Sequence, residues 1–236
     1  MFCLQEHTKM NKTEETIKLT LLEKGGLKQD VFEQIEEVFS WLKVIVKDLS
    51  VSLKKDVQGK DSRVEINFKE INKNEFQLTC GGDILLFQKH SNVFKFDTSH
   101  ALWQTGYLKD DESNGFCGMI YMHNFLKDSL KFKRQHDLGY LVGRMFVNKE
   151  KHFFLEGKKQ LGFLYNNFST EVLSKEKLKE VVLSTISFVL AFDLFIPPYS
   201  EMNELAVYQL IEMRQNQSVK TAKRLGFKFS DEMDVI

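Results

Sequence analysis

Hydrophobic residues recur at alternating steps of three and four along residues 27–55. The recurring positions are Phe32, Ile35, Phe39, Leu42, Val46, Leu49 and Leu53. This spacing places them on one face of an amphipathic α-helix, whose opposite face is charged. A stripe of this length must pack along a comparably long partner. Two interpretations stay open: the partner is the protein's own sheet or helices, or it is a second copy of the same helix in a dimer.

Apolar and polar residues alternate along parts of the segment 62–98, a pattern typical of half-buried β-strands. Turn-forming sequences at 72–74 and 81–83 divide the segment into runs that predict an antiparallel meander. The expected strands lie at 64–68, 76–80, 84–87 and 93–96. We expect the last two to pair with each other.

Two further runs, 139–147 and 152–158, are rich in Phe, Leu, Val and Tyr and are joined by the polar sequence 148–151. Such residues fit a pleated, half-buried surface, so this stretch predicts a β-hairpin. Residues 117–122 form another candidate strand. The acidic segment 109–115 is expected to be a solvated loop.

The two ends of the chain differ in character. Residues 1–26 are polar and end at Gly25-Gly26, so we expect a loosely held arm with a short strand at 17–22. Toward the other end, Ser174 is suited to cap a helix over 175–195. The apolar half of that helix is shorter than the roughly 20 residues of a membrane span, so we expect a buried core helix. A last helix is expected over 201–225.

These elements predict an α+β fold. Its centre is a mostly antiparallel β-sheet formed by residues of about 62–165, flanked by the long 27–55 helix and two C-terminal helices. Residues 27–236 are expected to form a single domain, with the polar arm 1–26 outside it.

Composition narrows the function classes only in part. Lysine plus arginine and aspartate plus glutamate each number 33, so the net charge is zero and no global field attracts nucleic acid or an anionic membrane. The cysteines Cys3, Cys80 and Cys117 lack the C-x-x-C spacing of zinc ribbons and redox motifs. The first residues lack the continuous apolar stretch of a signal peptide, so the cytoplasm is the expected location.

The candidate chemistry lies in the hairpin, where Leu155-Glu156-Gly157-Lys158 sets an acid and a lysine two residues apart in an apolar strand. This sequence resembles the E-x-K element of the PD-(D/E)xK nuclease fold, in which the acid and the lysine face a metal ion and a scissile phosphate. The resemblance implies a second carboxylate nearby, because a divalent cation needs more than one. In the two registers that the turn allows, however, Glu156 faces Gly143 or Arg144.

Other binding signals are sparse. Arg144, Lys158 and Lys159 are candidates for binding a phosphate near this strand, and basic residues cluster with aromatic ones at 125–134 and 220–228. The six histidines show no metal-ligand spacing, and the sequence lacks the Walker-A, G-x-G-x-x-G and G-x-S-x-G motifs. We therefore expect neither a metal ion nor a cofactor.

The sequence favours a non-enzymatic intracellular module for protein interaction or assembly, which docks a protein partner or self-associates and does not insert into a membrane. The residues expected at such an interface are the helix positions Phe32, Ile35, Phe39, Leu42 and Val46. The alternative is a nucleic-acid-binding protein, including a divergent PD-(D/E)xK-like metal-dependent nuclease with Glu156 and Lys158 in its active site.

Overall fold

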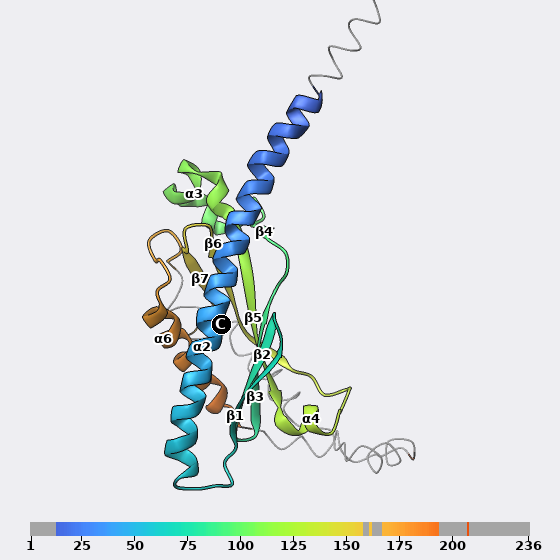
Figure 1. Ribbon diagram of the computed structural model, residues 1–236, viewed down its shortest axis with the longest axis vertical. Helices are drawn as coiled ribbons and strands as arrows, with labels where there is room; N and C mark the ends of the chain where they lie inside the picture. Colours follow the sequence, from blue (N-terminus) through green and yellow to red (C-terminus); the bar gives the residue numbers. More distant parts are fainter. Residues whose placement is uncertain (1–12, 158–160, 162–166, 194–206, 208–236) are drawn as a thin grey trace, which may run out of the picture.

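The computed structural model describes residues 13–157, 161, 167–193 and 207 (Figure 1). A helix runs without a break through residues 13–58, in which the wide π-helical turn η1 (Leu21–Gly25) leads directly into α2 (Gly26–Gln58). The long helix predicted over 27–55 is confirmed. The strand expected at 17–22 is wrong, and the described part of the predicted arm is helical.

The helix continues past the expected boundary because both glycines there adopt helical backbone angles. The φ and ψ angles are −66° and −48° at Gly25, and −56° and −52° at Gly26. Glycine is permitted these angles like any other residue, although it gains less from them. A glycine pair therefore marks a helix end only when its backbone turns left-handed, which the sequence does not reveal.

Seven strands form one antiparallel sheet in the order β1-β2-β3-β5-β6-β7, with the short β4 paired to β5. The strands are β1 (Ile66–Asn72), β2 (Glu75–Cys80), β3 (Asp83–Lys89), β4 (Phe94–Lys95), β5 (Phe116–Leu126), β6 (Tyr140–Asn148) and β7 (Phe153–Gly157). The α+β class and the antiparallel sheet are as the sequence predicts.

One predicted pairing is wrong. The segments 84–87 and 93–96 do not pair with each other, because β3 and β4 both pair with β5. The first two residues of β5 pair with β4, and the residues from Ile120 to Leu126 of β5 pair with β3. A single 11-residue strand thus serves two partners, which the alternation within 62–98 could not show.

One face of the sheet is covered by α2 and α6 (Lys175–Leu190), which lie next to each other in Figure 1. The stripe of α2 packs on the rings of this face: the ring centroids of Phe39 and Phe76 lie 5.2 Å apart, and those of Phe76 and Phe87 lie 4.9 Å apart. Helix and sheet approach closely at Gly118, where an added Cβ would lie 2.6 Å from the Cβ of Ile35. The stripe therefore finds its long partner within the chain.

The helix α6 begins as predicted, since the Ser174 hydroxyl accepts a hydrogen bond from the backbone N–H of Lys177 at 3.1 Å. It ends at Leu190, five residues before the expected end, and buries only one face. Val182 is fully buried, whereas its neighbour Leu183 is 44% exposed. None of the helices in the described ranges is long and apolar enough to cross a membrane. Apart from residue 207, the helix expected over 201–225 lies outside the described residues.

The opposite face of the sheet is covered at one end by the segment 94–115. It contains η2 (Ala101–Gln104), α3 (Gly106–Asp110) and η3 (Glu112–Gly115), and Leu108 is its fully buried anchor. The charged residues 109–112 are exposed as expected, but they lie in or next to short helical turns, and Asn114 at the end of the segment is only 4% exposed. At the far end of β5 the short helix α4 (Lys127–Lys131) follows.

Candidate protein-interaction surface

The predicted hairpin is present, and its register decides the chemistry of Glu156. Val147 lies opposite Phe153, so Arg144 lies opposite Glu156, which is one of the two registers left open by the sequence. The Arg144 Nε–H donates to a Glu156 carboxylate oxygen at 2.6 Å, and a second guanidinium nitrogen contacts the same oxygen. The carboxylate faces a cation of its own sheet and not a second carboxylate.

This arrangement does not build the metal site that the nuclease resemblance implies. Among the residues that the structure describes, no group of three or more His, Cys, Asp or Glu side chains could hold a metal ion. Lys158 and Lys159 lie outside the described residues. Arg144 also sits over the Phe146 ring, at 5.4 Å from its centroid, so the pair forms part of a cross-strand cluster on the sheet surface.

The helix positions expected at an interface belong to the protein's own core. The exposed fractions are 1% for Ile35, 2% for Phe39, 1% for Leu42 and 0% for Val46. Phe32 is half-buried and covers the ammonium group of Lys89, which lies 5.1 Å from its ring centroid. These side chains can meet a second copy only if the helix leaves the sheet.

A polar cluster fastens the segment 94–115 to the turn between β6 and β7. The Tyr107 hydroxyl donates to a Glu150 carboxylate oxygen at 2.6 Å and accepts from the Asn148 side-chain amide at 2.8 Å. The His152 ring stacks on that of Tyr107 with a centroid separation of 4.5 Å. Burial, together with the hydrogen bond to Glu150, raises the pKa of Tyr107, so the phenol stays protonated and holds the segments together.

A second link in the same place joins Lys149 to the segment 94–115. Its ammonium lies 2.7 Å from an Asp111 carboxylate oxygen and 2.6 Å from the Ser113 hydroxyl. The pKa of Asp111 is lowered to about 2. The largest cause is the hydrogen bond from the Lys149 ammonium, and the hydrogen bonds from the Ser113 hydroxyl and N–H contribute less. Sequence reasoning missed both links because their members lie more than 30 residues apart along the chain.

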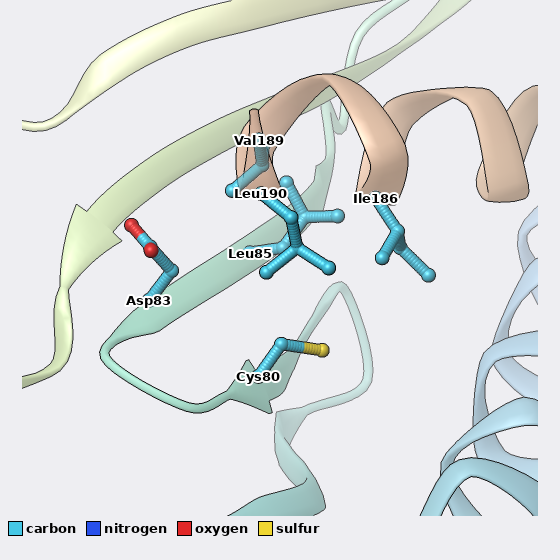
Figure 2. Close-up of a pocket in the computed structure, with 6 residues that line it drawn as sticks. All are labelled: Cys80, Asp83, Leu85, Ile186, Val189 and Leu190. Atoms are coloured by element: carbon cyan, nitrogen blue, oxygen red, sulfur yellow. The ribbon is translucent and has the colours of Figure 1, made fainter. Parts of the chain in front are cut away.

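A small pocket lies at the end of the sheet, between the β2–β3 turn and the last turn of α6 (Figure 2). It is lined mainly by apolar side chains, with Cys80 and Asp83 at its edge. Burial, assisted by the nearby Asp83 carboxylate, raises the pKa of Cys80 to about 11. The thiol is therefore protonated at neutral pH and is a poor nucleophile.

The basic cluster at 127–134 is partly neutralised by acids of the same domain. The Lys127 ammonium contacts the Glu65 carboxylate, and an Arg134 guanidinium nitrogen lies 3.9 Å from an Asp137 oxygen. The cluster at 220–228 lies outside the described residues. The described cluster thus presents a mixed surface instead of a uniformly basic one.

The most unusual surface belongs to the first turns of the long helix. Figure 1 shows this part of the helix, in dark blue, rising well beyond the sheet and the other helices. Val31 is the first buried residue, and every residue of 13–24 is exposed. We call residues 13–30 the projecting helix. Its exposed large apolar side chains are Ile17, Leu19, Leu21 and Leu22, which are 53%, 54%, 67% and 73% exposed, whereas Leu27 is half-buried.

Sequence reasoning assigned residues 13–26 to an arm and so did not predict this surface. The available signal was apolar residues at 17, 21 and 22 continuing upstream of the 27–55 stripe. Comparison of the chain with protein-family models, with curated proteins and with solved structures finds no match.

Proposed function

We propose that this protein is a non-enzymatic interaction module that binds an α-helical partner through the projecting helix. The observation that carries the proposal is the set of four large apolar side chains in residues 13–24, all of which are exposed in the part of the chain that the structure describes. Ile17 and Leu21 are four residues apart and so lie together on one side of this helix, and such adjacent apolar exposure marks an interaction site more often than scattered single residues do.

The physical cost of the projecting helix supports the same interpretation. Most helices in proteins are stabilised by packing of an apolar face, and the projecting helix, which continues from α2, extends beyond the part of α2 that has such packing. The exposed turns also contain Gly25 and Gly26, each of which costs about 1 kcal/mol relative to alanine inside a helix. A partner that covers Ile17 and Leu21 would supply the missing packing.

The polar clusters described above support a structural role for the sheet. Glu156 is paired with Arg144, Tyr107 with Glu150 and Asn148, and Cys80 is protonated at neutral pH. The Arg144–Glu156 pair joins β6 to β7, and the Tyr107 hydrogen bonds join the segment 94–115 to the turn between these strands, so these groups have structural partners.

Site-specific photo-crosslinking tests the proposal. A photoreactive phenylalanine analogue is placed at Leu21 and, as the matched control, at Val51, which is 64% exposed on the same long helix over the sheet. Both variants are irradiated as purified protein and in extract of the source cells. We expect an adduct with a polypeptide from position 21 and none from position 51. Equal adducts from both positions, or none from position 21 in either setting, would contradict the proposal.

A further inference from the structure

We propose that the partner of the projecting helix is a second copy of this chain, bound antiparallel with Leu21 on the two-fold axis. This inference rests on the function proposed above and adds the identity of the partner. Its first support is the glycine pair. Neither glycine has the positive φ angle that demands glycine, and a Cβ added at either would meet no atom of the described residues within 4 Å.

The protomer therefore gains nothing from glycine at these two positions. A small residue on a helix surface leaves space above the backbone, and a large side chain of a neighbouring helix can fill that space. Ile17, Leu21 and Gly25 follow one another at steps of four and so lie along one side of the helix. Along this side the residues are large at 17 and 21 and small at 25. A partner helix that runs in the opposite direction places its large residue against this small one.

An antiparallel copy centred on Leu21 satisfies this pattern. Leu21 meets its own copy, and Ile17 of each chain lies against Gly25 of the other. The same register sets Glu14 of one chain beside Lys28 of the other, so opposite charges meet at both ends of the contact, while Lys18 lies level with Lys24 of the other chain and opposes the association. In a parallel pair each of these charges would face its own like charge, which disfavours that arrangement.

The register also leaves room for the two sheets. At ~1.5 Å per residue, the crossing point at Leu21 lies about 15 Å along the helix from Val31, the first buried residue. In the antiparallel arrangement the two domains lie at opposite ends of the helix pair. The contact spans about four turns, from residue 14 to residue 28, which predicts a weak dimer that dissociates on dilution.

Sedimentation velocity of the whole chain over a concentration series tests the proposal. We expect wild type to change from monomer to dimer as concentration rises. Leu21→Lys should stay monomeric, whereas the matched exposed variant Val51→Lys should dimerise like wild type. Gly25→Leu should weaken the dimer at least tenfold although it raises helix propensity, so a merely local role of the glycine predicts the opposite result.

Charge exchange tests the register. Glu14→Lys alone and Lys28→Glu alone should each weaken the dimer several-fold, and the double variant Glu14→Lys/Lys28→Glu should restore it. A parallel dimer would not show this rescue. A wild type that stays monomeric at high micromolar concentration, or a dimer unaffected by Leu21→Lys, overturns the inference. If the monomer nevertheless crosslinks from position 21 to another polypeptide, the proposed function stands and only the identity of the partner fails.

Discussion

Replacing Gly118 by alanine tests how closely the long helix lies on the sheet. The added Cβ would lie 2.6 Å from Cβ of Ile35 and 2.7 and 2.8 Å from its Cγ atoms. Favourable carbon contacts begin near ~3.5 Å, so helix and strand must separate by about 0.9 Å at this point. The atom in the way belongs to the base of a side chain on a helix, which cannot move without its backbone.

The expected cost follows from this geometry. Overpacking a well-packed core costs roughly 1–3 kcal/mol, and we expect about 2 kcal/mol for Gly118→Ala. With an m-value of about 2 kcal/mol/M, the urea midpoint should fall by about 1 M. Unfolding is followed by tryptophan fluorescence, because Trp41 lies on α2 and packs partly against the core.

Two further variants make the test specific. Gly82→Ala places a Cβ where no atom of the described residues lies within 4 Å, so its free energy of unfolding should stay within about 0.5 kcal/mol of the wild-type value. Ile35→Ala removes both Cγ atoms but keeps the Cβ at 2.6 Å, so its combination with Gly118→Ala should relieve only part of the clash and cost slightly less than the two single changes added together. A Gly118→Ala protein with the wild-type midpoint would refute the close contact between helix and sheet.

Three other predictions follow from buried and paired groups. Val182→Asp should cost several kcal/mol in urea denaturation because it buries an unpaired charge, whereas Leu183→Asp on the next position should cost less than about 1 kcal/mol. Glu36→Ala should cost about 1–2 kcal/mol, because it leaves the buried ammonium of Lys89 without its carboxylate partner although that carboxylate is itself 44% exposed; an unchanged midpoint would contradict the pairing. An NMR titration should give Asp111 a pKa of about 2, so its stabilising link is present above pH 4 and is lost as the pH falls through 2.

Much of the fold could be predicted because its signals are local. The period of the 27–55 stripe predicts a long helix, and the side chain of Ser174 predicts the start of α6. The antiparallel sheet follows from alternation and turn residues. Local patterns could not decide that β5 accepts both β3 and β4, because that choice depends on strands far apart in the sequence.

The interaction surface was harder to predict for a physical reason. The stripe position Phe39 and the exposed Leu21 are both large apolar residues on one helix, and the sequence alone does not show where the sheet ends beneath it. Helical periodicity identifies a face that is buried somewhere, not the molecule that buries it. The glycine pair added to the difficulty, since it suggested an end to the helix at the place where the helix leaves the domain.

Hydrogen exchange of the projecting helix tests the central claim most directly. The backbone amides of residues 13–24 are followed at low and high protein concentration, with the buried part of α2 around Phe39 as the internal reference. We predict rapid exchange of 13–24 at low concentration and protection at high concentration, while the reference stays protected throughout. Protection of 13–24 that does not change with concentration would contradict the claim, because the helix would then need no second copy to stabilise it.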